Sequence, residues 1–165
     1  MLELRVVDAA DWQIWRGLRL AALAEAPGAF GATLAEWQGV GDREDRWRAR
    51  LSIPGGRDLI ALLDGQPVAM ASGVPGEAAG TTEVISMWVS PLARGRGVSG
   101  RLLDALGSWS IGEGAHTLVL AVRVDNTAAI NAYRSAGFTV VLDADGHPIP
   151  NVACELTMTR PLPSP

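Results

Sequence analysis

The sequence contains no lysine, and all 14 of its basic residues are arginine. A Walker A phosphate-binding loop requires a lysine that contacts the nucleotide phosphates. An enzyme that forms a Schiff base with a carbonyl substrate or with pyridoxal phosphate also requires one. The missing lysine therefore excludes these classes of protein.

Cysteine and histidine are almost absent as well. The one cysteine, Cys154, excludes an internal disulfide and a cysteine-rich zinc site. Two histidines, His116 and His147, are too few for a multi-histidine metal centre, so we expect no bound metal. Because Cys154 stands in the predicted last strand and has no evident histidine partner, we expect it to be an inert core residue.

Long apolar runs and an excess of positive charge are missing too. No uninterrupted run approaches the roughly 20 residues of a membrane-spanning helix. Residues 1–5 lack the basic start of a secretory signal peptide. The net charge of −4 disfavours general binding to nucleic acid. We therefore expect a cytoplasmic protein that binds neither membranes nor nucleic acid.

The apolar residues that are present suit one globular domain, since 48% of the 165 residues are hydrophobic. Their spacing predicts the element order β-α-α-β-β-β-α-β-α-β-β, an α/β fold with a mixed sheet flanked by helices. We expect this domain to cover residues 1–160, with a proline-rich tail at 161–165. Strands are predicted at residues 2–7, 58–63, 67–74, 82–89, 117–123, 138–142 and 152–158, and the main helices at 12–26, 42–51, 97–110 and 126–136. A short additional helix is expected around residues 34–37.

A glycine-rich loop connects the fourth predicted strand to the helix at 97–110. The loop consists of Arg94, Gly95, Arg96, Gly97, Val98, Ser99 and Gly100. Few side chains shield its backbone N–H groups, and a helix N-terminus follows, which together make a site for phosphate oxygens. The loop therefore predicts a phosphorylated ligand.

The residues of the loop alone leave other interpretations open. The first is that the loop is an ordinary strand-to-helix connection that happens to be rich in glycine. It also matches the dinucleotide fingerprint G-x-G-x-x-G, with Asp125 further along the chain. However, residues 90–94 separate the strand from the glycines, and too little chain follows for the usual strands of a dinucleotide-binding fold.

A third interpretation comes from a resemblance to the GNAT superfamily of N-acetyltransferases. Residues 91–103, PLARGRGVSGRLL, resemble the acetyl-CoA-binding motif of that superfamily, Q/R-x-x-G-x-G/A. Arg94 and Gly97 match the motif, and Ser99 stands where glycine or alanine is usual. Residues 124–138, VDNTAAINAYRSAGF, resemble the next motif of the superfamily.

The resemblance implies that acetyl-CoA is the co-substrate. The backbone amides of residues 94–100 would hold the pyrophosphate, which agrees with the positive end of a helix dipole, and Arg94 and Arg96 would add attraction. The pantetheine arm would lie between the strands at 83–89 and 117–123, which splay apart in this superfamily. The acetyl group would lie alongside Met87, Trp88 and Val89, where a backbone N–H can stabilise the oxyanion of the reaction.

The resemblance also implies catalytic roles. Tyr133 would be the general acid that protonates the departing CoA thiolate, although it also suits a half-buried aromatic position. Glu83 would act as general base, often through water, although a carboxylate at a strand start is commonly just exposed. Asn126 would bond the pantetheine, although a helix N-cap explains its residue type equally well. Asp125 and Glu36 are weaker candidates for the base.

We therefore expect an enzyme that moves the acetyl group of acetyl-CoA directly to a primary amine. The expected acceptor is a small molecule, such as an amino acid, a polyamine or an amine antibiotic, selected by residues 26–41 and 143–151. The alternatives are a protein or peptide acceptor, and a non-catalytic module that binds acyl-CoA. A homodimer is expected only by analogy with the superfamily.

Overall fold

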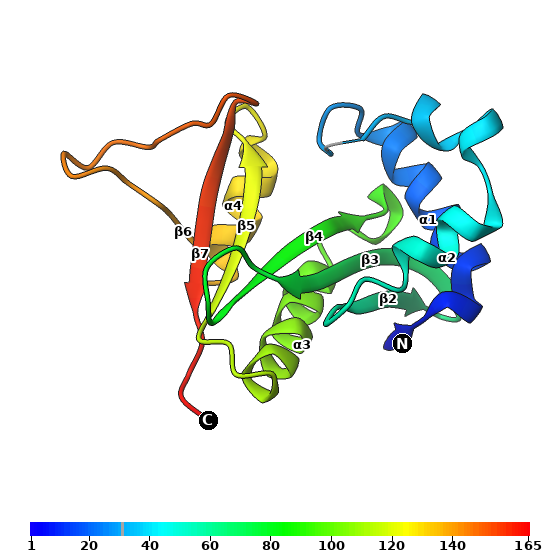
Figure 1. Ribbon diagram of the computed structural model, residues 1–165, viewed down its shortest axis with the longest axis horizontal. Helices are drawn as coiled ribbons and strands as arrows, with labels where there is room; N and C mark the ends of the chain where they lie inside the picture. Colours follow the sequence, from blue (N-terminus) through cyan, green and yellow to red (C-terminus); the bar gives the residue numbers. More distant parts are fainter. Residues whose placement is uncertain (31) are drawn as a thin grey trace. The chain divides into compact units, whose positions relative to one another are not determined.

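The computed structural model describes residues 1–30 and 32–165 and has the expected mixed α/β architecture (Figure 1). Seven strands follow the hydrogen-bonded order β1-β2-β3-β4-β5-β7-β6. The strands are β1 (Leu2–Val7), β2 (Arg57–Leu63), β3 (Gln66–Pro75), β4 (Thr81–Val89), β5 (Thr117–Arg123), β6 (Thr139–Val140) and β7 (Glu155–Pro161). The α-helices are α1 (Trp12–Glu25), α2 (Glu44–Arg50), α3 (Val98–Gly112) and α4 (Thr127–Ser135). The predicted fold class is therefore confirmed.

The largest departures from the prediction lie near the C-terminus. Strand β6 has 2 residues instead of the five predicted at 138–142. Strand β7 begins at Glu155, because the side-chain oxygen of Asn151 accepts hydrogen bonds from the backbone N–H groups of Ala153 and Glu155, both at 2.9 Å, and bends the chain. Strand β7 also includes Pro161, so the predicted tail begins inside the strand.

The expectation that Cys154 is a core residue is wrong. This residue is exposed, and it lies in the turn before β7 with a φ of 58°. The left-handed backbone conformation is uncommon for a residue with a Cβ and suits a turn rather than a strand. Cys154 is therefore a surface thiol.

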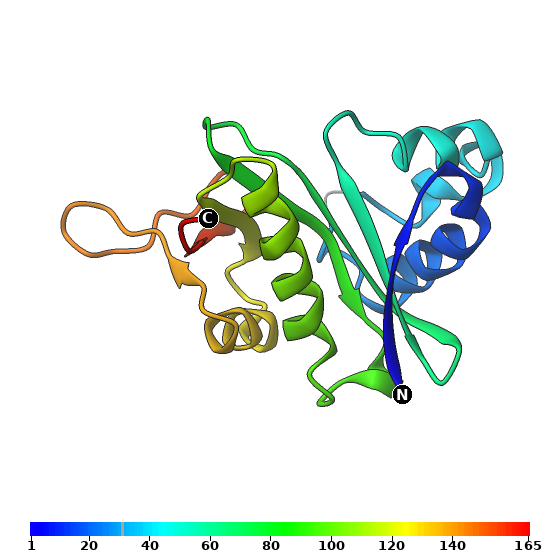
Figure 2. The same cartoon turned by 90° about the horizontal axis from the view of Figure 1, so that it is seen from below.

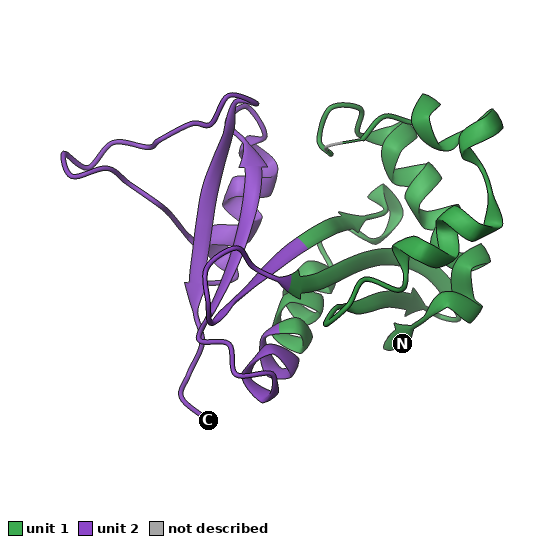
Figure 3. Cartoon of the chain, in the orientation of Figure 1, with its two compact units in different colours: residues 1–74, 85–106 green, residues 75–84, 107–165 purple. Residues whose placement is uncertain are grey.

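The chain forms two compact units, and neither is a continuous segment (Figure 3). Unit 1 comprises residues 1–74 and 85–106, and unit 2 comprises residues 75–84 and 107–165. Strand β4 and helix α3 each contribute one part to unit 1 and another to unit 2. The chain therefore passes between the units more than once.

Unit 1 is built on strands β1, β2 and β3, which pair antiparallel in sequence order. Helices α1 and α2 lie on one face of these strands, and the first half of α3 lies on the other (Figure 2). Helix α1 buries one stripe of apolar side chains, spaced by three or four residues as in an amphipathic helix. The core of this face consists of Val7, Trp15, Leu18, Ala22, Trp47, Leu51, Ile60, Leu62, Met70 and Trp88.

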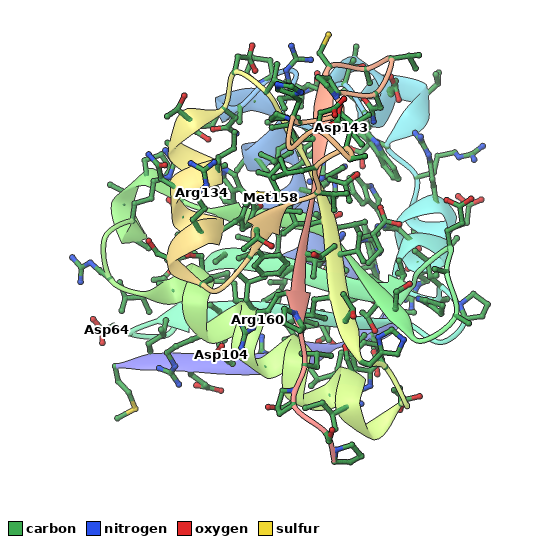
Figure 4. All side chains as sticks on the ribbon, turned by 90° about the vertical axis from the view of Figure 1, so that its left-hand side faces the viewer. Asp64, Asp104, Arg134, Asp143, Met158 and Arg160 are labelled. Atoms are coloured by element: carbon green, nitrogen blue, oxygen red, sulfur yellow. The ribbon has the colours of Figure 1, made fainter. Side chains whose placement is uncertain are left out.

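Unit 2 is built on β5, β6 and β7, with β7 paired antiparallel to both neighbours. Helix α4 lies beside these strands, and a long loop joins β6 to β7 (Figure 1). Met158 of β7 is fully buried, and Figure 4 labels it together with Arg160 on the same strand and Arg134 on α4. Within this unit, Thr81–Glu83 of β4 pairs parallel with Thr117–Val119 of β5.

Strand β4 is irregular in its second part, which belongs to unit 1. Ser86 has a φ of 54°, a left-handed conformation that a strand residue does not normally adopt. Such a residue bends a strand and re-aims the groups that follow it. The bend therefore lies immediately before Met87–Val89, the segment that the sequence predicts to line the acetyl group.

Candidate functional site

The glycine loop lies in unit 1 between β4 and α3. Ala93 and Val98 are buried on its two sides, whereas residues 94–97 are exposed. Gly95 and Gly97 have φ values of 75° and 74°, so glycine is needed there for the backbone conformation. The buried side chains thus anchor a loop whose middle presents backbone to solvent.

The backbone N–H groups of residues 95–100 are the main chemical feature of this loop. No residue in the described part of the chain accepts a hydrogen bond from any of them, and the first N–H of α3 with a backbone acceptor belongs to Arg101, which donates to Gly97. A helix N-terminus concentrates partial positive charge on such free N–H groups. The loop can therefore bind an anion with several oxygens, such as a pyrophosphate.

Glycine at position 100 has another explanation than at 95 and 97. The φ of Gly100 is not in the left-handed region, and a Cβ built on it meets nothing within 4 Å. The protein itself would therefore tolerate a side chain at this position. A glycine that neither backbone geometry nor packing requires fits a position that a ligand approaches closely.

The Arg94 side chain turns back onto the protein. Its Nη2 donates to both carboxylate oxygens of Glu25, at 3.0 and 2.9 Å, and its Nε donates to the carbonyl oxygen of Val89 at 3.1 Å. These contacts tie the loop to the end of α1 and to the end of β4. The charge of Arg94 is thus balanced by Glu25, and its predicted attraction for pyrophosphate stays a prediction.

Glu25 is a site residue that the sequence analysis missed. Its carboxylate also accepts a hydrogen bond from Nε1 of Trp88, at 2.9 Å. The hydrogen bonds from Arg94 and then from Trp88 hold the pKa of Glu25 below its usual value. Glu25 therefore connects two of the predicted site residues, Arg94 and Trp88. No local sequence pattern indicates this role, because 69 residues separate Glu25 from Arg94.

The other predicted residues of unit 1 differ in burial. Trp88 is buried, whereas Met87 and Val89 are half-buried. Arg96 is exposed, and its charge adds to that of the N-terminal ammonium group in lowering the pKa of Asp64, which Figure 4 labels. Packing explains the ring of Trp88, while the backbone of Met87 and Val89 lies at the bend of β4.

A buried ionic network lies next to this bend. Arg50 of α2 donates to Asp58 at 3.1 Å, to Ser72 at 2.9 Å and to Ser86 at 3.0 Å. Ser72 in turn donates to Asp58. The side chains of Arg50 and Asp58 are only 14% and 8% exposed. The hydroxyl of Ser86, the residue with the left-handed backbone, is thereby fixed to α2.

In unit 2, Asn126 is the N-cap of α4. Its side-chain oxygen accepts a hydrogen bond from the backbone N–H of Ala129, at 3.2 Å. This bond satisfies one of the free N–H groups at the start of the helix. The capping interpretation is therefore confirmed, and the contact of Asn126 with pantetheine stays a prediction.

Tyr133 lies on α4, half-buried, with its ring centroid 5.9 Å from that of Phe138 in an edge-on arrangement. Burial raises its pKa to about 12. No described residue shares a hydrogen bond with its hydroxyl. The phenol therefore stays protonated at neutral pH and has a proton to donate.

Glu83 is half-buried in β4, where it pairs with Val119 of β5 within unit 2. Its role as general base stays a prediction. Of the weaker candidates, Asp125 pairs with Arg123, with 3.2 Å between Oδ1 and Nε, and the side chain of Glu36 accepts from Thr33. Neither of these two carboxylates is free of a partner.

The segments expected to select the acceptor are described with one exception, because Gly31 lies outside the described residues. Asp42 accepts hydrogen bonds from Nε of Arg16 at 2.7 Å and from Nε1 of Trp47 at 2.8 Å, and its pKa falls to about 2. Asp143 accepts from the backbone of its own loop, at Asp145 and His147. These carboxylates hold local structure together.

Two further features bear on the expectations from composition. Among residues 1–30 and 32–165, no group of three or more histidine, cysteine, aspartate or glutamate side chains is placed to hold a metal ion. Within the same residues, no helix has the length and apolar character needed to cross a membrane.

Comparison with known proteins agrees with this geometry. The model of the Acetyltransferase (GNAT) family matches residues 21–138. The chain is 32% identical over 147 residues to a mycothiol acetyltransferase of Cellulomonas flavigena, which covers 80% of this chain. The chain spans only 38% of the length of that relative.

Solved structures share the fold. The PaiA N-acetyltransferase of Thermoplasma acidophilum in complex with coenzyme A has a TM-score of 0.77 at 13% identity, covering 98% of this chain and 99% of its own. YncA of Salmonella typhimurium with its cofactor acetyl-CoA has a TM-score of 0.75 at 22% identity, covering 100% of this chain and 96% of its own. Together with the match over residues 21–138, the free N–H groups of the loop and the cap at Asn126 lead to one conclusion: the chain belongs to the GNAT family of acetyltransferases.

Proposed function

We propose that this protein transfers the acetyl group of acetyl-CoA directly to a primary amine of a small molecule. The observation that carries the proposal is the run of backbone N–H groups at residues 95–100 without an acceptor in the described chain. A pyrophosphate supplies the oxygens that such a run requires. PaiA and YncA, the structural relatives, are described with coenzyme A and acetyl-CoA, which supports the same ligand here.

In the proposed reaction, the amine nitrogen forms a bond to the acetyl carbon, and the bond from that carbon to sulfur breaks. The electron pair of the broken bond leaves on the sulfur, and the amine loses one proton. The left-handed Ser86 directs the backbone after it, so the N–H groups of Met87–Val89 are the candidates for stabilising the carbonyl oxygen. Glu83 receives the amine proton, directly or through water.

Tyr133 assists the departure of the thiolate in this proposal. With a pKa of about 12, its phenol is a much weaker acid than a thiol, whose pKa is about 8.5. Complete transfer of its proton to a free thiolate is therefore unfavourable. Tyr133 is better suited to donate a hydrogen bond that stabilises the developing negative charge on sulfur. The one proton that the amine releases balances the one negative charge of the thiolate.

An assay of thiol release with a panel of amines tests the proposal. We expect release of free CoA thiol only when acetyl-CoA and an accepted amine are both present. Titration calorimetry with acetyl-CoA and with NAD identifies the bound ligand independently of turnover. Tight binding of NAD without binding of CoA would overturn the proposal, and CoA binding without turnover of any amine would favour a non-catalytic module.

A further inference from the structure

Arg19 of α1 carries a positive charge for which the described residues 1–30 and 32–165 provide no hydrogen-bonding or ionic partner. Its Nη1 is buried, and no described residue accepts a hydrogen bond from it. The guanidinium carbon lies 4.7 Å from the centroid of the Phe30 ring, which covers one face of the group. Burying a charged donor without an acceptor is costly, so such a group in a folded protein calls for an explanation.

The positive charge of Arg50 adds to this imbalance. Burial, followed by the positive charge of Arg50, lowers the pKa of Arg19 to about 10, so it is still charged at neutral pH. Arg50 has its own partners in Asp58, Ser72 and Ser86. Asp58 balances one of the two arginines, and the group of three therefore has a net charge of about +1 by simple addition.

The position of this charge relates it to the proposed reaction. Arg50 contacts the hydroxyl of Ser86, and Ser86 immediately precedes Met87–Val89, which line the acetyl group in the proposed function. The Trp15 ring lies under Arg50, with 5.1 Å between the guanidinium carbon and the ring centroid. Trp15 and Arg19 are four residues apart on α1 and share one face of the helix. The uncompensated charge therefore belongs to the same part of unit 1 as the bend in β4.

We propose that Arg19, with Arg50 behind it, binds the carboxylate of the acceptor, and that the acceptor is an amino acid. A carboxylate carries one negative charge and neutralises the group, whereas a phosphate dianion would over-compensate it. The N–H donors of a guanidinium lie in its plane, so the Phe30 ring on its face uses none of them, and a carboxylate can pair with them in that plane. This inference rests on the proposed function and assigns its substrate class.

The kinetic test compares α-amino acids with their α-carboxamides as acceptors. We expect the wild-type KM to be at least about tenfold lower for the amino acids, which corresponds to one charge-assisted contact. In Arg19→Met, the KM for the amino acid rises to that for the carboxamide, while kcat changes less. Arg48→Met is the control, since it removes an exposed arginine of α2 that pairs with Glu44. Equal KM values for both acceptor types in the wild type would overturn the inference.

A binding test separates this inference from the proposed function. Calorimetry with N-acetylalanine, N-acetylalaninamide and inorganic phosphate requires no turnover. We expect the wild type to bind only N-acetylalanine, and Arg19→Met to lose that binding. Thiol release from amines without this selectivity would refute the carboxylate site and leave the function standing. Carboxylate binding through Arg19 without thiol release would refute the function and leave the site. Stronger binding of phosphate would also refute the carboxylate assignment.

Thermal unfolding of Arg19→Met tests whether Arg19 has a purely structural role. Replacing an unpaired buried charge by methionine, an apolar residue of similar length, is expected to leave the unfolding midpoint unchanged or to raise it. A lower midpoint, together with an equal loss of activity on amino acids and carboxamides, would show that Arg19 supports the fold and would overturn the inference.

Discussion

Arg94 and Glu25 form an ion pair in which Nη2 of the arginine lies 3.0 and 2.9 Å from the two carboxylate oxygens. The pair connects the arginine of the glycine loop to the last residue of α1. The two side chains are 51% and 33% exposed, so the pair contributes little to stability, about 0–1 kcal/mol. Its importance lies in holding the loop in one position.

If the pair positions the loop, Glu25→Gln, Arg94→Met and the double variant should weaken CoA binding by similar amounts. The effects are then non-additive, because each variant breaks the same link. Titration calorimetry with CoA measures the three affinities. Tighter binding in Glu25→Gln combined with weaker binding in Arg94→Met would contradict this, and would mean that the freed guanidinium binds phosphate itself.

Gly97 and Gly100 should respond differently to alanine. Gly97→Ala places a Cβ at a φ of 74°, which costs about 1–2 kcal/mol of stability. Gly100→Ala has no such strain and lies within α3, where alanine is favoured by about 0.5–1 kcal/mol.

Urea unfolding and CoA titration of the two variants distinguish stability from binding. We expect Gly100→Ala to be at least as stable as the wild type and yet to bind CoA more weakly, because its methyl group points into space that the ligand needs. Unchanged CoA affinity in Gly100→Ala would show that the pyrophosphate does not bind at this part of the loop.

Tyr133 is the one tyrosine of the chain, so the ultraviolet absorbance of tyrosinate reports on it alone. We expect a midpoint near pH 12, compared with about 10 for an exposed tyrosine, because burial disfavours the charged form. Between these values the unfolded chain releases the proton before the folded one does. The contribution of Tyr133 to the free energy of unfolding is therefore constant below about pH 10 and declines above it.

Tyr133→Phe should abolish the absorbance change and the associated decline in stability above pH 10, with circular dichroism used to confirm that the chain is folded at each pH. The same variant should lower kcat far more than CoA affinity if the hydroxyl assists the leaving thiolate. A titration midpoint near 10 would show that the phenol is not desolvated.

Among the carboxylates of unit 1, Asp58 should cause the largest loss in the free energy of unfolding when it is replaced by alanine. Asp58→Ala leaves Arg50 buried without its charged partner, a change that typically costs about 3–5 kcal/mol. Asp45→Ala is the matched control, since Asp45 is 76% exposed and pairs with Arg43 at 3.5 Å. Urea unfolding of both variants measures the difference. A loss below about 1 kcal/mol in Asp58→Ala would show that the network is not tightly coupled.

Local patterns in the sequence were sufficient for much of this fold. The periodicity of apolar residues located α1 and β4 to within about a residue, and the Asp64-Gly65 turn between β2 and β3 followed from turn chemistry alone. The end of the chain was less accurate, because the turn at Asn151 depends on side-chain hydrogen bonds that no periodicity reveals. The strand prediction there extended into a loop.

The site was predictable only where its residues are close together in sequence. The glycine loop and the cap at Asn126 were found because each is a short motif with its own physical purpose. Glu25 and Arg19 were not found, because a glutamate at a helix end and an arginine on a helix both suit a solvent-exposed face. Their roles arise from contacts with distant segments.

The way the chain crosses between its two units limits how this protein can be divided or recombined. Unit 1 takes residues 1–74 and 85–106, so a fragment that ends at any point between them lacks part of that unit. A chimera made by a single crossover in the 75–84 segment would combine strands β1–β3 of one parent with the loop helix of another. Exchange of the glycine loop between relatives therefore requires two crossovers, which keep β4 and α3 together.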